Sequence, residues 1–566
     1  MANYIKDVKE ELVTLIKKSI EKAINEGEFP DFEITNEDII IEVPKEKVNG
    51  EFSTNIAMKL AKKVRKAPKM CAEVIIKNFN KEGTFIENIE CAGVGFINFH
   101  LKSEWLNKVL EIINEEKQDY GKSEIGKGQK VMVEFVSANP TGPLHMGNAR
   151  GGALGDLIAG VLELTGHDVT REFYVNDAGN QIAKFGISLE ARYIQQLKGE
   201  DAIQFPEDGY HGEDIVEHVK NYIKENGDKL LDVSVEERRN SLVSYALPRN
   251  ISMIKSGLER YGINYDVWFS EKSLYETNEI KRVLQTLKDN GYCIEKEGAL
   301  WFKSPMLGDD KEAVLVRNNG VATYFTADIA YHKNKFIDRK FDRVINLWGA
   351  DHHGHVARMK AAVSALGINP DKLDIVLFQL VHLYKDGEKV RMSKRTGKAI
   401  SLIDLLDEVG KDAARFIFNT KASGNHLDFD LDLAVKQSNE NPVYYVQYAY
   451  ARICSILRLC EKEGTKLKDI KDIDLNLLNK KEEIDLIRAL ARYPEEIEIA
   501  AKTLEPCRIT RYILDVAGLF HSFYNSCRIK DEEENLKQAR LVLITSVKIV
   551  MKNVLDLLKI SAPEKM

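Results

Sequence analysis

The feature that most constrains the fold is a change of pattern at Val131, where β-rich runs begin to alternate with helical segments. Residues 131–137 and 169–175 are β-rich, and between them residues 149–164 form a helical segment containing Gly and Ala, ended by Gly166. Strand patterns at 344–348 and 375–383, a helical pattern at 356–366 and a hairpin signal at 318–320 follow. This alternation predicts a doubly wound α/β domain with a parallel sheet and insertions, such as the polar stretch at 198–232.

The two ends of the chain have different patterns. An amphipathic helix with Val8, Leu12, Leu15 and Ile16 on one face opens the chain, and a strand at 95–99 closes this first unit. After about Ala434 the strand signals stop and apolar residues recur at helical spacing. We therefore predict a multidomain chain: a small α+β domain at 1–105, an α/β domain at 118–435 and an all-α bundle at 436–566.

Composition agrees with several domains and leaves the binding partner open. At roughly 150 residues per domain, 566 residues correspond to three or four domains. The net charge of -7 argues against a uniformly basic surface but not against local basic patches. Seven scattered cysteines without a Cys-x-x-Cys pair, and a charged rather than apolar N-terminus, predict a cytoplasmic protein with no membrane span.

A Gly- and Pro-containing loop joins the first strand of the sheet to its helix. Residues 134–148 read Glu-Phe-Val-Ser-Ala-Asn-Pro-Thr-Gly-Pro-Leu-His-Met-Gly-Asn, and loops at this edge of a parallel sheet bind nucleotides and phosphates. Gly142 and Gly147 would let a ligand approach the backbone, and His145 could donate to a phosphoryl oxygen. Neither the Gly-x-Gly-x-x-Gly nor the Walker motif is present. The alternative is a plain turn with an incidental histidine.

A second polar segment lies at another strand-to-helix edge of the same domain. Residues 389–397 read Lys-Val-Arg-Met-Ser-Lys-Arg-Thr-Gly and precede a helix that we expect to start near Ser401. Ser393, Lys394 and Arg395 could fold over a triphosphate, since cations of this kind suit phosphate. Alone, the segment could be a solvated basic loop. The two segments together are more specific than either.

These segments resemble the signatures of the class I aminoacyl-tRNA synthetases. The HIGH signature matches His145 to Asn148, and the KMSKS signature matches Arg391 to Arg395. Within that class the chain is similar to the arginyl-tRNA synthetases at 137–145, 174–181, 349–354 and 444–452, and the likeness reaches both ends. It implies a Rossmann-like class I catalytic domain with insertions, an additional tRNA-contacting N-terminal domain and a C-terminal anticodon-binding bundle.

The resemblance also implies an ATP site, with Mg2+ as the ATP counter-ion and no metal site made by the protein. The catalytic residues would be His145, Asn148 and Lys394. The ATP-binding residues would be Pro140, Gly142, His145, Gly147, Asn148, Met392, Ser393 and Lys394. Two departures stand out: Asn148 replaces the second HIGH histidine and cannot become a cation. Arg391 and Arg395 replace the outer lysine and serine positions, which leaves Lys394 as the only lysine of that motif.

The arginine pocket can be argued from the chemistry of its ligand. A guanidinium is planar, forked and permanently charged, so it calls for carboxylates in a fixed geometry. We select Glu134 and Asp328, the latter four residues after Tyr324 and so on the same face of a helix. The resemblance adds Ser137, Asn139, Tyr324 and His352. The alternative is a buried Glu134 paired with an internal arginine, and a Tyr324 that belongs to the core.

For tRNA, the C-terminal stretch offers cations and aromatic side chains that suit phosphates and unstacked bases. These are Arg488, Arg492, Arg508 and Arg511 with Tyr512, Phe523 and Tyr524, though a solvated bundle face with core aromatics has the same composition. The expected function is ligation of L-arginine to tRNA(Arg) through an arginyl-adenylate, with tRNA bound before adenylate formation, by a monomer.

Two other functions stay open from the residues alone. One is a different HIGH-type enzyme, either a synthetase for another amino acid or a small-molecule nucleotidyltransferase. The absence of zinc-ligand cysteines and the presence of a large helical bundle disfavour it. The other is an inactive paralogue that binds RNA. His145 and Lys394 disfavour that paralogue, whereas Asn148 keeps it open.

Overall fold

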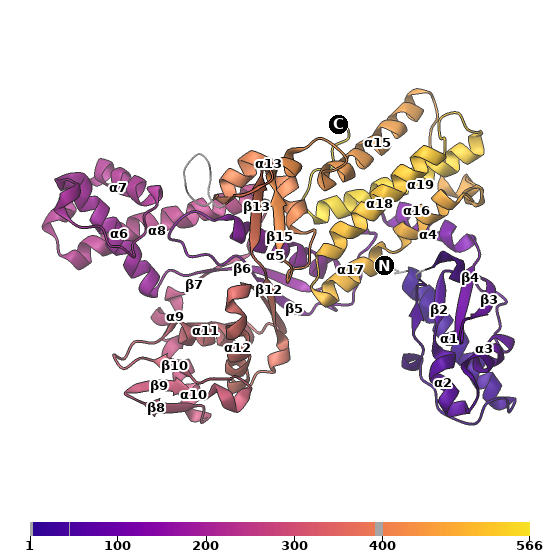
Figure 1. Cartoon of the computed structure of the whole chain (residues 1–566), viewed down its shortest axis with the longest axis horizontal. Coiled ribbons are helices and arrows are strands. Elements are labelled where there is room, and N and C mark those ends of the chain that lie inside the picture. Colours follow the sequence, from indigo (N-terminus) through magenta and orange to yellow (C-terminus); the bar gives the residue numbers. More distant parts are fainter. Residues whose placement is uncertain (1–3, 45, 391–399) are drawn as a thin grey trace.

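A five-stranded parallel sheet forms the centre of the molecule, and the other parts extend from it (Figure 1). The computed structural model describes residues 4–44, 46–390 and 400–566. The sheet has the order β12-β11-β5-β6-β7. Its strands are β5 (Lys130–Glu134), β6 (Asp168–Val175), β7 (Val267–Ser270), β11 (Arg343–Gly349) and β12 (Leu373–Phe378). The strand order reverses beside β5, so the carboxyl ends of β5 and β11 form the crevice where such sheets bind ligands.

The two faces of this sheet belong to different hydrophobic cores. Val131 and Val133 of β5 pack in the core that continues through α5 (Met146–Leu164) into the C-terminal helices. Met132, between them, packs on the opposite face in a second core. That core is formed with α10 (Glu279–Asp289), α11 (Tyr324–Lys333) and α12 (His353–Ala365). An all-apolar strand run is therefore explained by burial on both faces.

Two insertions form most of the remainder of the α/β domain. Between β6 and β7 the chain forms a helical insertion of α6 (Gly179–Lys198), α7 (Glu213–Asn226) and α8 (Val235–Arg260), which has its own core and projects from the sheet (Figure 1). Between β7 and β11 lie α9 (Lys272–Glu276), α10, α11 and the antiparallel strands β8 (Cys293–Lys296), β9 (Ala299–Phe302) and β10 (Ala313–Val316). The predicted polar insertion at 198–232 is thus the tip of a larger helical unit.

The expected single strand at 375–383 is wrong, because the chain leaves the main sheet after Phe378. The second half of the run, β13 (Val381–Lys385), joins β14 (Glu388–Val390) and β15 (Leu427–Asp430) in a separate sheet. At the break, the backbone N–H of Gln379 donates to Ser423 O at 3.0 Å. The buried Arg150 side chain donates to Gln379 O at 2.6 Å. Tertiary contacts of this kind leave no periodic signal.

The end domains have the expected classes. The N-terminal sheet, β1-β2-β4-β3, consists of β1 (Ile41–Glu42), β2 (Phe52–Thr54), β3 (Ile86–Ala92) and β4 (Phe96–Leu101), with α1 (Tyr4–Asn25), α2 (Ile56–Val64) and α3 (Pro68–Lys77). Helix α4 (Glu104–Glu116) leads to β5. Helices α13 (Leu402–Phe418) and α14 (Leu431–Val435) precede the bundle. The bundle is α15 (Pro442–Lys462), α16 (Lys481–Ala491), α17 (Tyr493–Thr503), α18 (Cys507–Ser526) and α19 (Glu534–Leu557).

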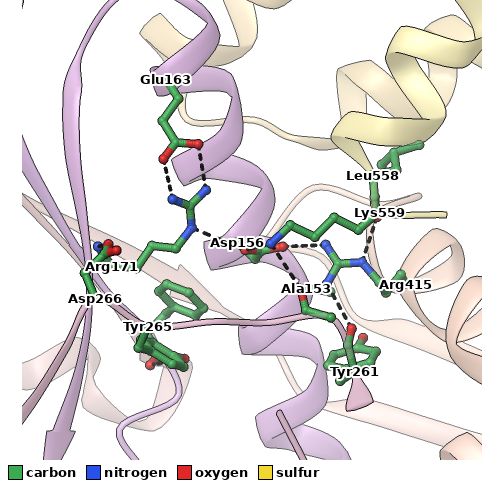
Figure 2. A network of polar contacts seen from close by, with 12 residues as sticks. Ala153, Asp156, Glu163, Arg171, Tyr261, Tyr265, Asp266, Arg415, Leu558 and Lys559 are labelled. Carbon is green, nitrogen blue, oxygen red and sulfur yellow. Dashed lines mark hydrogen bonds and ion pairs between the residues drawn. The ribbon is translucent and has the colours of Figure 1, made fainter. Parts of the chain in front are cut away.

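A buried charge network joins the bundle to the central sheet (Figure 2). Asp156 of α5 accepts from Arg415 of α13 at 2.6 Å and from Lys559, just after α19, at 2.7 Å. Arg171 of β6 lies 3.4 Å from the same carboxylate and also pairs with Glu163. One carboxylate therefore ties together three elements that are far apart in the sequence.

Candidate functional site

The loop after β5 begins with strained backbone. The strand ends at Glu134, three residues earlier than its sequence suggests, because Val136 and Ser137 have φ of 69° and 39°. A positive φ is costly for a β-branched residue and persists only where surrounding contacts enforce it. Here Tyr265 donates its hydroxyl to Phe135 O at 2.9 Å, and the Tyr174 N–H donates to Ser137 Oγ at 3.2 Å. The residues that follow therefore leave the sheet in one fixed direction.

His145 and Asn148 cap the helix that follows this loop. The Gly147 N–H donates to His145 Nδ1 at 3.2 Å, and the His145 N–H donates to Asn148 Oδ1 at 3.0 Å. Helix α5 therefore starts at Met146, three residues before the predicted start. A Cβ on Gly147 would lie 3.1 Å from His145 Cε1, so glycine there leaves room for the histidine ring. The Asn148 amide nitrogen is a donor that the capping contacts do not use.

The protonation of His145 follows from the cap. Because Nδ1 accepts a hydrogen bond, the proton of the neutral ring lies on Nε2. Burial lowers the pKa of His145, which keeps the ring neutral near pH 7. The site thus presents one N–H donor together with the N-terminus of α5, which favours negative charge. This arrangement suits a phosphate group.

The segment after the second signature is tied to the first. The Met146 N–H donates to Ile400 O at 3.3 Å, and the Leu402 N–H donates to Leu144 O at 2.8 Å. Together with β13 and β14, these segments line a cavity of about 240 Å³ whose walls include His145, Gly147, His382 and Val390. Met392, Ser393 and Lys394, with Arg391 and Arg395, lie outside the described residues, but Val390 and Ile400 on either side of them both face this cavity.

Glu134 is committed to an internal ion pair. Lys335 Nζ lies 2.5 Å from Glu134 Oε2 and also donates to Asn346 Oδ1 at 3.1 Å, and the lysine side chain is fully buried. Ser137 Oγ donates to Glu134 Oε1 at 2.9 Å. Lys335 thus gives Glu134 a cation partner inside the protein, and contact of Glu134 with the guanidinium stays a prediction. The pair with Lys335 is the internal pairing left open by the sequence, with lysine in place of arginine.

Glu271 is a buried carboxylate close enough to Asp328 to feel its charge, and the sequence reasoning did not single it out. Glu271 follows β7 and is 5% exposed, and none of the main influences on its pKa comes from a cation among the described residues. Burial raises the pKa of Glu271 to about 7, and the nearby charge of Asp328 adds to the rise, opposed by hydrogen bonds from Tyr174 and Tyr275. Two neighbouring carboxylates, with the imidazole of His355 beside Asp328 as their basic neighbour, are suited to a positively charged ligand. The available signal was a glutamate at the carboxyl end of a strand.

The other predicted arginine-site residues lie on the elements around these two carboxylates. Asp328 and Tyr324 share one face of α11, as predicted, and His355 Nε2 lies 3.4 Å from Asp328 Oδ2. Tyr324 is 69% exposed, so it is not a core residue. His352 is exposed beside Trp348, with ring centroids 6.1 Å apart. Across the crevice, Asn139 Oδ1 accepts from Asn176 Nδ2 at 3.0 Å.

Most of the C-terminal residues considered for tRNA have structural roles instead. Tyr512 and Phe523 are buried, and Arg488 and Arg508 pair with Glu51 and Glu496. A different cluster is available: the guanidinium of Arg452 lies 4.8 Å from the ring centre of Tyr448 and 4.6 Å from that of Tyr524, which is 38% exposed. Tyr444 stacks on Tyr448 at 6.1 Å. This ladder of rings and one cation suits unstacked bases.

No group of three or more His, Cys, Asp or Glu side chains is placed to hold a metal ion in the described ranges. Among the helices of those same ranges, none is long and apolar enough to span a bilayer.

Comparison with known proteins identifies the family. Residues 10–101 match the arginyl tRNA synthetase N-terminal domain, residues 108–435 the class I (R) tRNA synthetase catalytic domain, and residues 446–566 the DALR anticodon binding domain. The chain is 66% and 62% identical, over the full length of both partners, to the arginine–tRNA ligases of Acetivibrio thermocellus and Ruminiclostridium cellulolyticum. Thermus thermophilus arginyl-tRNA synthetase has the same fold, with a TM-score of 0.73, 21% identity and coverage of 97% of this chain and 99% of its own.

These matches cover all three parts of the chain, and they agree with the HIGH-type loop, the sheet order and the helical bundle described above. The chain therefore belongs to the arginyl-tRNA synthetase family.

Proposed function

We propose that this chain ligates L-arginine to tRNA(Arg), with ATP as the energy source, at the crevice between β5, β6 and α11. The observation that carries the proposal is the pair Glu271 and Asp328: a buried carboxylate with its pKa raised to about 7 next to a second carboxylate. A guanidinium between them would supply the missing positive charge and a planar fork for both. Family membership supplies the reaction.

The reaction proceeds in two displacements. A carboxylate oxygen of arginine attacks the α-phosphorus of ATP, and the bond to the bridging oxygen breaks, so that pyrophosphate leaves with the electron pair. A ribose hydroxyl of the terminal adenosine of tRNA then attacks the carbonyl carbon of arginyl-adenylate. It loses its proton and expels AMP. Both steps depend mainly on positioning and on stabilising dispersed negative charge.

The ATP site is assigned to the loop after β5 and the segment around Lys394. His145 donates through Nε2, Asn148 through its side-chain amide, and Gly147 leaves the start of α5 open to the phosphates. Pro140 and Gly142 shape the loop. The KMSKS-type residues Met392, Ser393 and Lys394 complete the list of ATP-binding residues, with Lys394 as the cation of the set. Mg2+ enters as part of the MgATP substrate, held by the phosphates.

The arginine site is assigned to Glu271 and Asp328, with Tyr324, His352, Ser137 and Asn139 around them. The carboxylates fix the guanidinium. Ser137 and Asn139 lie at the loop between the two substrates, where the α-amino and carboxylate groups of arginine must reach the α-phosphate. Glu134 supports Ser137 from below through the hydrogen bond between their side chains.

The tRNA surface is assigned to the bundle and the N-terminal domain. Arg452, Tyr448 and Tyr524 form the stacking surface for unpaired bases of the anticodon loop. We extend the proposal to a cytoplasmic monomer that binds tRNA before it forms the adenylate, and to domain limits at 1–105, 118–435 and 436–566.

The test is ATP-dependent charging of total tRNA with each of the amino acids in turn. We expect charging with arginine and with no other amino acid. Charging with a different amino acid would show that arginine is not the substrate. Absence of charging, with tRNA binding retained, would favour the inactive RNA-binding paralogue instead.

A further inference from the structure

One side chain of the helical insertion reaches the loop after β5. Asn250 of α8 is fully buried, and its Nδ2 donates to the backbone carbonyl oxygen of Pro140 at 3.0 Å. On its other side, Asn250 Oδ1 lies 2.6 Å from Nε2 of His218 on α7. A continuous chain of contacts therefore runs from α7 through α8 to the loop.

The direction of these hydrogen bonds is fixed by their chemistry. A carbonyl oxygen only accepts, so the amide of Asn250 must turn its Nδ2 toward Pro140. Its oxygen then faces His218 and requires that Nε2 of His218 carry the proton. Without that donor, the Asn250 oxygen is buried with no hydrogen bond. If the amide turned over, its oxygen would face the carbonyl oxygen of Pro140, and the two acceptors would repel each other. The carbonyl oxygen of Pro140 thus fixes which way Asn250 points, and Nε2 of His218 supplies the donor that the Asn250 oxygen needs in that orientation.

The position of Pro140 makes this contact relevant to catalysis. Pro140 lies between the strained turn at Val136 and Ser137, with φ of 69° and 39°, and His145 at the start of α5. Tyr265 and Tyr174 hold the turn from the side of the sheet. Asn250 holds the following residues from the side of the insertion. Strained backbone stays in place only when contacts on several sides determine it.

We propose that His218 and Asn250 are positioning residues for adenylate formation, through which the helical insertion of α6, α7 and α8 holds the loop in the geometry that receives the triphosphate. This inference rests on the proposed function, since it assigns the loop to ATP. Neither residue touches a substrate. Their effect is to hold the backbone at Pro140 in place, and this in turn keeps the loop residues that lead to His145 close to the reacting phosphate.

The experiment compares two substitutions at His218 in the full-length protein. His218→Gln keeps an N–H at the position of Nε2, and His218→Leu removes it with a side chain of similar size. His211→Leu is the matched control, because His211 is an exposed histidine of the same insertion whose contacts, a 3.5 Å approach to Glu207 O and a ring contact with Phe205, do not involve Asn250 or Pro140. The measurements are pyrophosphate exchange with arginine, ATP and tRNA(Arg), the Kd for arginine, and the thermal unfolding midpoint.

We expect His218→Leu to lower kcat of exchange about tenfold to a hundredfold, since displacing reacting groups by about 1 Å has effects of this size. The Kd for arginine should stay within about twofold, because the carboxylates of that pocket lie on other elements. His218→Gln should keep kcat within about threefold of the unsubstituted protein, and His211→Leu should leave it unchanged. A purely structural role would instead lower the unfolding midpoint and all activities together.

Asn250→Asp is the second variant, nearly identical in shape and able to accept from His218 but unable to donate to Pro140. It should show the same loss of kcat as His218→Leu. The inference is overturned if either variant keeps kcat within about twofold, or if His218→Gln falls as far as His218→Leu. If the unsubstituted protein itself shows no arginine-dependent pyrophosphate exchange in the presence of tRNA(Arg), it is the proposed function that fails, and the variants are then not needed to decide it.

Discussion

At the scale of single residues, the carboxylates of the site differ in whether a cation of the protein itself neutralises them. Glu134 has Lys335 as a partner, whereas Asp328 has only the imidazole of His355 nearby and burial raises the pKa of Glu271, and we propose these two carboxylates as the partners of the ligand. His145 is set as a neutral donor by the cap of α5, and Asn148 completes that cap. The replacement of a histidine by Asn148 therefore keeps both an oxygen for the helix and an amide for the substrate.

The raised pKa of Glu271 predicts how arginine binding depends on pH. The guanidinium requires the ionised carboxylate, so the Kd for arginine should rise as pH falls below about 7, approaching tenfold per pH unit. The stability of the ligand-free protein depends on pH in the opposite direction to arginine binding. A folded-state pKa above 4.5 favours the neutral form, so the free protein loses stability as pH rises from about 4.5 through 7. Calorimetric titrations from pH 5.5 to 8.5 measure the first effect.

Glu271→Gln should flatten this pH profile and weaken arginine binding at pH 8. Glu276→Gln, an exposed neighbour on α9, is the control and should leave the profile unchanged. An unaltered slope in Glu271→Gln would show that another group causes the pH dependence.

Lys394 is the cation that we place on the triphosphate. Lys394→Ala should lower the rate of arginine-dependent pyrophosphate exchange by about a hundredfold or more, because removal of one group that stabilises the transition state has effects of this size. The thermal unfolding midpoint should stay the same. A nearly normal exchange rate would remove Lys394 from the mechanism.

At the scale of elements, local rules predicted most of the helices and strands but not their junctions. The alternation after Val131 gave the parallel sheet, and Asp328 and Tyr324 do share one face of α11. The early end of β5 and the split into β12 and β13 were missed, because tertiary contacts of Tyr265 and Arg150 cause them. Glu271 was missed for the same reason: its neighbour Asp328 lies on another element, and no spacing in the sequence brings them together.

Arg150 shows how one side chain fixes a junction. It lies on α5, is fully buried, and donates to three backbone carbonyl oxygens, those of Gln379, Ala422 and Asn425, at 2.6, 3.1 and 2.8 Å. Arg150→Met should lower the free energy of unfolding by about 3–5 kcal/mol, as three buried acceptors lose a charged donor. Urea unfolding measures this loss.

Arg192→Met on α6 is the comparison for Arg150. Its guanidinium lies 4.2 Å from the ring centre of Phe205 in the helical insertion. Its loss should cost only about 1 kcal/mol. Equal costs for the two substitutions would mean that the three carbonyl contacts add little to stability.

At the scale of the whole molecule, Asp156 links the central sheet to the chain just after the last helix of the bundle through its contacts with Arg415 and Lys559 (Figure 2). Burial alone would raise the pKa of Asp156, but the charges of Arg415 and Lys559 outweigh it and hold that pKa below its usual range. A lowered pKa stabilises the fold above the ordinary range of about 4, and this contribution disappears only as pH falls through the lowered value.

Asp156→Asn should therefore cost about 3–5 kcal/mol at pH 7, because the fully buried Arg415 would be left without its carboxylate. The cost should shrink on acidification below about pH 4. Glu163→Gln, which removes a half-exposed carboxylate bonded to Arg171, is the control and should cost less than about 1 kcal/mol. If Asp156→Asn and Glu163→Gln lowered the free energy of unfolding by similar amounts at neutral pH, the buried contacts of Asp156 would contribute no more than an exposed ion pair does.

The account of the whole enzyme depends on arginine being chosen by charge at Glu271 and Asp328. The most direct measurement is the ratio of the dissociation constants of citrulline and arginine, because citrulline has nearly the same shape but a neutral urea group. We expect the unsubstituted protein to prefer arginine by about a hundredfold or more, and Glu271→Gln/Asp328→Asn to reduce the preference to below about fivefold. A preference that survives the double substitution would contradict the account.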